Sequence, residues 1–196
     1  ELAYQIGVGT GRYLPDGEVV VGRDARSHSP EIADALIAGL IDGGARVADI
    51  GLVTTPMVYF AVESEQAVGG VMVTASHNPG DYNGFKICRE HAKPVGEATG
   101  LKDIEANAMS VDPAQRATTD EARIRHVDVL EAYLDHVKKV GKRLPERKLK
   151  IAIDCGNGMG AVSVEPLVRR WEDEGRMEVE RLYFELDGTF PNHEAD

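Results

Sequence analysis

One loop of this 196-residue chain carries a hydroxyl, an imidazole, an amide and an ammonium within eleven residues. Ser76, His77 and Asn78 follow the apolar run 69–75, and Lys86 comes ten residues after the serine, beyond an Asn-Gly turn. A loop of this kind can present a nucleophilic oxygen, a proton carrier and a positive charge to one anionic ligand. Each residue taken singly is also a turn former or a surface lysine, but that interpretation leaves their grouping unexplained.

The elements that lead to this loop alternate between strand and helix. Short apolar runs at 18–24, 46–51 and 69–75 predict buried parallel strands, and amphipathic or capped segments at 29–44 and 54–65 predict the helices between them. This βαβαβ order predicts an α/β fold with a mostly parallel, mixed sheet sandwiched by helices. Since ligands bind beyond the carboxyl ends of strands in such sheets, the serine loop lies where a ligand is expected.

Local signals refine two of these elements. Ser29 is expected to cap the first helix, with Pro30 in its first turn. The Asn83-Gly84 turn should fold the chain back, so that Lys86 lies beside the Ser76 hydroxyl and out of the solvent.

The second half of the chain contains a predicted domain boundary. A short helix at 96–110, a polar loop at 111–125 and a helix at 126–140 precede the charged segment 141–148. We place the boundary near residue 145 in that segment.

A second α/β domain is expected to begin after the boundary. Residues 149–175 predict a strand, a loop and a helix, and 178–186 predict another strand. The expected domains are therefore 1–145, which carries the serine loop, and 146–196, the first part of a similar unit.

Composition limits the partners and the compartment. The formal net charge is −11, and an acidic surface repels nucleic-acid phosphates and anionic membranes. No run of residues is long and apolar enough to cross a bilayer. Cys88 and Cys155 both follow apolar runs and are expected to be buried thiols and not a disulfide, which predicts a cytoplasmic protein.

Several motifs together resemble one known family. The loop TASHNPGDYNGFK resembles the active-site loop of the α-D-phosphohexomutases, the phosphomannomutase/phosphoglucomutase family. Four further motifs match that family in order along the chain: VGRDAR (21–26), TTP (54–56), DCGNG (154–158) and DGTFPNH (187–193). The stretch CREHAKPVGEATGL, which follows the loop, is most similar to bacterial phosphomannomutases.

The resemblance implies an isomerase that interconverts mannose or glucose 6-phosphate and 1-phosphate. Ser76 would be a phosphoserine that forms a hexose 1,6-bisphosphate intermediate, and His77 or Lys86 would carry the proton. His77, Asn78 and Lys86 would also bind the hexose phosphate. Asn78 is expected to shape the loop by bonding backbone groups.

The resemblance also implies a Mg²⁺ cofactor. One ligand would be the phosphate on Ser76, and aspartates of an Asp-Gly-Asp-x-Asp-Arg motif beyond Asp196 would supply the others. The resemblance implies later domains of the same chain that would select the sugar. These 196 residues do not include them, so this chain alone is expected to be inactive.

Three further interpretations of the sequence remain open. Arg23, Asp24 and Arg26 end a strand, and we favour an ion-pair network that braces the serine loop over direct contact with a ligand. Gly156, Gly158 and Ala161 have the spacing of a dinucleotide fingerprint, which would make the second unit an NAD-binding dehydrogenase domain with Glu178 or Glu180 on the ribose. A sugar-phosphate-binding module without turnover is the remaining alternative.

Overall fold

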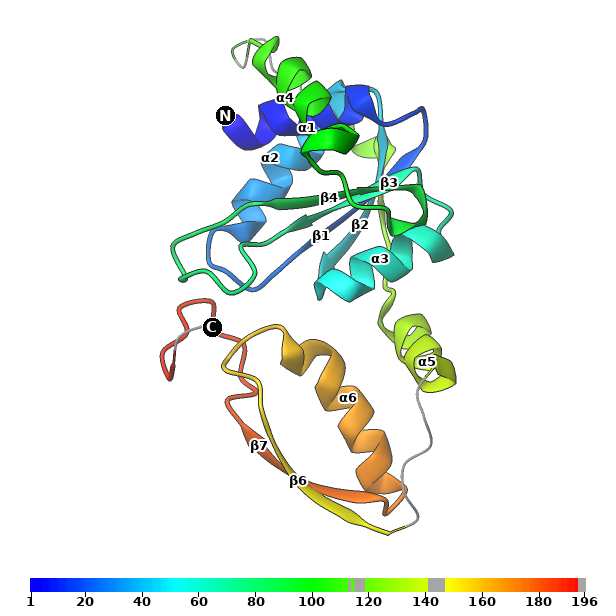
Figure 1. The fold of residues 1–196 in the computed structure, drawn as a ribbon, viewed down its shortest axis with the longest axis vertical. Coiled ribbons are helices and arrows are strands. Elements are labelled where there is room, and N and C mark those ends of the chain that lie inside the picture. Colours follow the sequence, from blue (N-terminus) through cyan, green and yellow to red (C-terminus); the bar gives the residue numbers. More distant parts are fainter. Residues whose placement is uncertain (113, 115–118, 141–146, 194–196) are drawn as a thin grey trace.

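The computed structural model describes residues 1–112, 114, 119–140 and 147–193, which form two α/β units, one above the other (Figure 1). The first unit has a five-stranded sheet in the order β4-β3-β1-β2-β5. Its strands are β1 (Glu18–Arg23), β2 (Arg46–Leu52), β3 (Gly69–Val73), β4 (Phe85–Arg89) and β5 (Ile124–His126). Its helices are α1 (Leu2–Tyr13), α2 (Ser29–Asp42), α3 (Thr55–Ser64), α4 (Leu101–Met109) and α5 (Leu130–Val140), with short 3₁₀ turns at Glu90–Ala92, Glu97–Thr99 and Glu121–Arg123.

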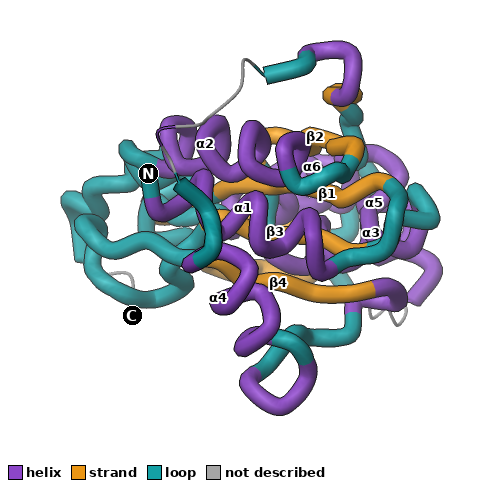
Figure 2. The backbone as a smooth tube through the Cα atoms, turned by 90° about the horizontal axis from the view of Figure 1, so that it is seen from above, coloured by secondary structure: helices purple, strands orange, loops and turns teal. Residues whose placement is uncertain are grey.

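The sheet is mostly parallel and mixed, as the sequence predicts. β1 pairs in parallel with β2 and with β3, β2 pairs in parallel with β5, and only β4 runs antiparallel, beside β3. Helices cover both faces (Figure 2). The alternation of β1 fixes the two cores, because Val19 and Val21 pack toward α2 whereas Val20 packs toward α3.

The chain reverses direction across the sheet between β1 and β3. β2 lies on one side of β1 and β3 lies on the other, so the carboxyl ends of β1 and β3 form a topological switch point. The turn that follows β1 and the serine loop that follows β3 meet there. Figure 1 shows both loops directed toward the second unit.

The second unit is smaller. β6 (Leu149–Asp154) pairs in parallel with β7 (Met177–Leu182), and α6 (Gly160–Asp173) connects them. One face of this pair packs on α6 through Val168, Met177 and Val179. The predicted boundary near residue 145 lies within 141–146, outside the described residues.

The structure differs from the predicted local structure at several elements. α1 was not anticipated, since its glycines disfavour a helix in isolation. β5 falls inside the predicted loop 111–125 and extends to His126, so α5 begins at Leu130 and not at 126. β7 ends at Leu182, before the expected limit of 186. Ser29 lies inside α2 and does not cap it, because His28 is the N-cap and the Ser29 hydroxyl bonds to Asp24.

Both cysteines are free thiols, as expected, but the predicted burial is confirmed only for Cys88. Cys88 is buried in β4, and burial raises its pKa to about 11. Cys155 is half-buried, and burial also raises its pKa. Among the described residues, no helix has the length and hydropathy required to span a bilayer.

Glycines allow α1 to lie directly against α2. A Cβ atom on Gly39 of α2 would lie 2.0 Å from the backbone oxygen of Tyr4, and one on Gly7 of α1 would lie 2.3 Å from the backbone oxygen of Leu36. The two helix backbones are therefore in contact, and this packing explains why a glycine-rich segment is helical here.

Gly39→Ala should destabilise the first unit by about 1–3 kcal/mol, because the added methyl group has to push two helix backbones apart. Urea unfolding measures the loss. Gly96→Ala is the matched control, since a Cβ there would meet only Thr99 Oγ1 at 3.7 Å. Equal stability of the two variants would contradict the close helix contact.

Candidate active site

The serine loop joins β3 to β4 and holds Ser76 in a conformation that needs support. Ser76 is exposed and has φ +57°, a left-handed backbone that costs energy for a residue with a side chain. Its N–H donates to Thr74 Oγ1 at 3.0 Å, and the Asn78 N–H donates to the backbone oxygen of Ala75 at 3.1 Å. These short-range bonds shape the turn that presents the Ser76 hydroxyl.

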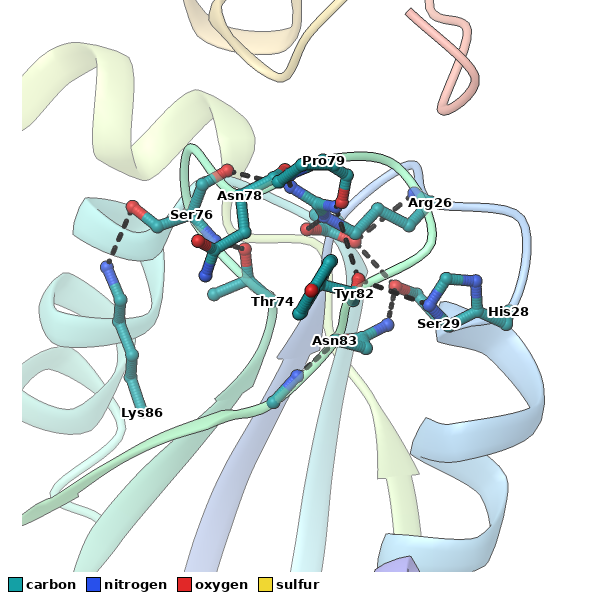
Figure 3. A network of polar contacts seen from close by, with 12 residues as sticks. Arg26, His28, Ser29, Thr74, Ser76, Asn78, Pro79, Tyr82, Asn83 and Lys86 are labelled. Carbon is teal, nitrogen blue, oxygen red and sulfur yellow. Dashed lines mark hydrogen bonds and ion pairs between the residues drawn. The ribbon is translucent and has the colours of Figure 1, made fainter. Parts of the chain in front are cut away.

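Arg26 supplies most of the remaining support. Its side chain is only 1% exposed, and its guanidinium donates to four backbone carbonyls of the loop (Figure 3). The acceptors are the oxygens of Ser76 at 2.9 Å, Asn78 at 2.7 Å, Tyr82 at 3.1 Å and Pro79. A planar group with five donors can satisfy several acceptors at fixed angles, which a lysine cannot do.

Asp24 balances the buried charge and closes the network. Its carboxylate accepts from Arg26 Nε at 3.2 Å and from the Ser29 hydroxyl, and the Ser29 oxygen accepts from Asn83 Nδ2 at 2.8 Å. The bracing network expected from the sequence is therefore confirmed for Asp24 and Arg26. Arg23 is not part of it, since no side-chain bond of Arg23 occurs among the described residues.

Lys86 approaches the loop from β4, on the side away from Arg26 (Figure 3). Its Nζ lies 3.5 Å from Ser76 Oγ, at the outer limit of a hydrogen bond. The expected proximity to Ser76 is confirmed, but the expected shelter from solvent is wrong, because the lysine side chain is exposed. A phosphoryl group on Ser76 would bring its oxygens to this ammonium.

The structure brings His77 and Asn78 to the same loop, where both are exposed. Asn78 contributes through its backbone, because its oxygen accepts from Arg26 and its N–H donates to Ala75. Its side-chain amide makes no hydrogen bond within the described part of the chain, so the expectation that this amide shapes the loop is wrong.

A cavity of ≈ 650 Å³ lies between the two units. Ser76 and His77 line one side of it, and Asp154, Cys155 and His193 line the other. His193 Nε2 lies 3.3 Å from Asp154 Oδ1, and the pKa of Asp154 is lowered mainly by the hydrogen bond from the Gly156 N–H. Sequence reasoning identified the loop side of this cavity and missed the opposite side, although the motifs DCGNG and DGTFPNH hold those residues.

The dinucleotide alternative has no support in this geometry. The N–H groups of Gly156, Asn157 and Gly158, which would have to cradle a pyrophosphate, are bonded within the protein. In a dinucleotide-binding fold, the acidic residue that binds the ribose must also end the following strand. Glu178 and Glu180 lie within β7, and that strand ends at Leu182.

No three His, Cys, Asp or Glu side chains of the described residues are grouped to hold a metal ion. Near Ser76, the carboxylate of Asp24 is buried and already bonded to Arg26 and Ser29.

The fold and this loop define a known class. A sequence model described as phosphoglucomutase/phosphomannomutase, alpha/beta/alpha domain I, matches residues 1–115. The chain belongs to the phosphoglucomutase/phosphomannomutase family.

Two curated bacterial relatives cover nearly the whole chain. It is 39% identical to a phosphomannomutase of Escherichia coli over 98% of its own length and 42% of the relative. It is 40% identical to a phosphomannomutase/phosphoglucomutase of Pseudomonas putida over 100% of its length and 40% of the relative. The chain therefore spans about two fifths of the length of these relatives.

Solved structures agree with this assignment. A phosphoglucomutase/phosphomannomutase family protein from Burkholderia thailandensis aligns with a TM-score of 0.76 at 32% identity, over 98% of this chain and 42% of that chain. A structure titled as a putative phosphomannomutase from Thermus thermophilus aligns with a TM-score of 0.80 at 28% identity, over 98% and 44% of the two chains.

Arg26→Lys should destabilise the first unit by at least about 2 kcal/mol, because several partly buried carbonyls lose donors from a buried guanidinium, at about 1 kcal/mol or more each. Urea unfolding measures the effect. Arg23→Lys is the control. Arg23 is the last residue of β1 but lies outside the network, so this substitution should change the free energy of unfolding by less than about 0.5 kcal/mol. If the two variants lose the same stability, Arg26 does not brace the loop.

Proposed function

We propose that this chain is the phosphoserine-bearing part of a phosphohexomutase, an isomerase that interconverts hexose 6-phosphates and 1-phosphates, with mannose or glucose as the sugar. The observation that carries the proposal is the setting of Ser76. Its hydroxyl is exposed at the switch point of the sheet, its backbone is bonded by a buried arginine, and an ammonium lies 3.5 Å from its Oγ. The names of the relatives from Escherichia coli and Pseudomonas putida supply the reaction class.

The proposed reaction has two phosphoryl transfers. In the first, the bond between phosphorus and Ser76 Oγ breaks, a sugar hydroxyl forms the new bond to phosphorus, and the hydroxyl proton passes through a base to the leaving Ser76 Oγ. The product is a hexose 1,6-bisphosphate. After the sugar reorients, Ser76 Oγ attacks its other phosphate, the bond from phosphorus to the sugar oxygen breaks, and the Ser76 proton passes through the base to that oxygen. Phosphoryl transfer depends mainly on positioning and charge stabilisation, and a braced loop favours both.

Lys86 and His77 are the two candidates for the proton and the charge. The ammonium of Lys86 is close enough to contact the oxygens of a phosphate on Ser76, which supports charge stabilisation. His77 lines the cavity next to Ser76 and is in place to exchange a proton with a bound sugar. Asn78 completes the proposed binding residues through its exposed amide.

We include Mg²⁺ as the cofactor, with a phosphate oxygen on Ser76 as one ligand and the others supplied by aspartates beyond Asp196. When bound, the ion would neutralise charge on the phosphoryl oxygens. The carboxylate of Asp24, beside the loop, is already paired with Arg26, which supports an outside source for the remaining ligands.

The chain is proposed to act together with the further residues that its relatives carry. The whole enzyme is this chain joined to those further residues. In this view residues 1–145 form the serine domain and 146–196 begin the second domain, with the ≈ 650 Å³ cavity between them as part of the substrate site. Free thiols at Cys88 and Cys155 suit the cytoplasm as its compartment.

Ser76→Ala should lower kcat of the whole enzyme by at least about 10³-fold, the loss expected when a covalent nucleophile is removed. A coupled assay with mannose 1-phosphate and glucose 1-phosphate measures it. Residual turnover above about a tenth of wild type would remove Ser76 from the mechanism.

Intact mass separates the mutase from a binding module that lacks turnover. After incubation with glucose 1,6-bisphosphate, the wild type should gain the mass of one phosphoryl unit on Ser76, and Ser76→Ala should gain none. Ser110→Ala serves as the matched control, since Ser110 ends α4, and this variant should be labelled like the wild type. Sugar-phosphate binding with no label in any variant would favour the binding module.

Lys86→Arg and Lys86→Met together distinguish the roles of the lysine. If Lys86 only stabilises charge, Lys86→Arg should retain most of the activity while Lys86→Met loses at least about tenfold. If it transfers a proton, both variants should fail, because guanidinium hardly deprotonates. A pH–rate profile of each variant measures the difference, and near wild-type rates in both would leave His77 as the proton carrier.

A further inference from the structure

Arg26 is contacted from the second unit by an aromatic ring. The Cζ atom of Arg26 lies over the ring of Phe190, 5.4 Å from its centroid. We infer that Phe190 is a positioning residue for the phosphoryl-transfer site, acting on Ser76 through Arg26. The inference rests on the proposed role of Ser76, but the contact itself joins the second unit to the serine loop whatever the reaction is.

The geometry of the guanidinium leaves room for such a contact. Its in-plane N–H groups are bonded to Asp24 and to the carbonyls of the serine loop. A planar cation bonded around its edge can be approached only over its faces, and an aromatic ring is the group that attracts a cation there. Because Arg26 is 1% exposed, the ring also helps to exclude water from these hydrogen bonds.

The backbone beside Phe190 is held against the first unit at very short range. A Cβ on Gly188 would lie 2.3 Å from the backbone oxygen of Ala25 and 2.6 Å from Arg26 Cα. On the other side, a Cβ on Gly80 of the serine loop would lie 3.0 Å from the Gly188 oxygen. The turn that carries Phe190 therefore lies in backbone contact with both segments that shape the site.

The turn is also fixed from within the second unit. Phe190 has φ +52°, and its N–H donates to the backbone oxygen of Asp187 at 3.0 Å. The Asp187 carboxylate accepts from the Thr189 hydroxyl and N–H, which lowers its pKa, and the Asp187 N–H donates to the Asn157 oxygen at 3.0 Å. Phe190 and Ser76 are thus two left-handed residues, one from each unit, that meet at the same guanidinium.

These contacts predict how Ser76 depends on Phe190. When the ring is removed, water reaches the guanidinium, its bonds to the Ser76 and Asn78 carbonyls weaken, and Ser76 is free to leave its left-handed conformation. The Ser76 hydroxyl then spends less time beside Lys86. The ring itself lines the cavity, but the substitutions remove no polar group that could bind a hexose phosphate, so the loss should fall on kcat and not on KM.

The test compares four variants of Phe190 and one control. Phe190→Leu and Phe190→Ala remove the aromatic face, whereas Phe190→Tyr and Phe190→Trp retain it. Phe184→Leu is the matched control, because Phe184 lies under Arg181 in the same unit, 6.0 Å from Cζ to centroid, and does not line the cavity. Two measurements are made: kcat and KM of the whole enzyme, and amide hydrogen exchange of the serine loop in this chain.

We expect Phe190→Leu and Phe190→Ala to lower kcat about tenfold with KM unchanged, a loss of the size given by a desolvated cation–π pair. The amides of Ser76, Asn78 and Tyr82 should exchange faster by a similar factor, while those of β1 and β3 stay protected. Phe190→Tyr, Phe190→Trp and Phe184→Leu should match the wild type in both measurements.

A wild-type kcat and wild-type loop exchange in Phe190→Leu would overturn the inference. An equal loss of kcat in Phe184→Leu would also overturn it, because it would indicate general loosening of the second unit. Failure of the proposed function gives a different pattern. In that case the wild-type whole enzyme shows no turnover, yet the exchange measurement on this chain still reports whether Phe190 holds the loop.

Discussion

The buried guanidinium of Arg26 is the interaction on which the site depends. A loop that presents an exposed serine in a left-handed conformation has few ways to stay ordered, because its residues face solvent and its backbone is strained. Four loop carbonyls bonded to one planar cation fix the loop, and the carboxylate of Asp24 bonds the Nε of that cation and holds it aligned. Either group alone would be an unpaired buried charge, so the pair functions as a unit.

The sheet topology determines where this pair can exist. Because β1 lies between β2 and β3, the turn after β1 and the loop after β3 share one edge, and an arginine two residues past a buried aspartate reaches the neighbouring loop. The second unit meets the same edge through Phe190, so one side chain connects three segments that are far apart in the sequence. Because the cavity is lined by both units, this contact lets the position of the second unit act on the serine loop.

The sequence predicted those features that depend on local patterns. Apolar runs with turn residues predicted the mixed sheet, and the Asn-Gly turn predicted that Lys86 returns to Ser76. Features that depend on tertiary contact were missed. α1 is helical because its glycines fit against α2, β5 is a three-residue edge strand that Arg125 ties to Glu18 and Glu65, and Phe190 has a role only through a partner 164 positions earlier in the chain.

The most direct test of the account is the ionisation of a phosphate placed on Ser76. With phosphoserine incorporated at position 76 of this chain, ³¹P NMR across pH gives the second pKa of that phosphate, which is about 6 for the free group. The ammonium of Lys86, held beside Ser76 by the braced loop, should lower this pKa below the free value, and Lys86→Met should return it toward 6. A second pKa at or above about 6 in the wild type, unchanged in Lys86→Met, would contradict the account.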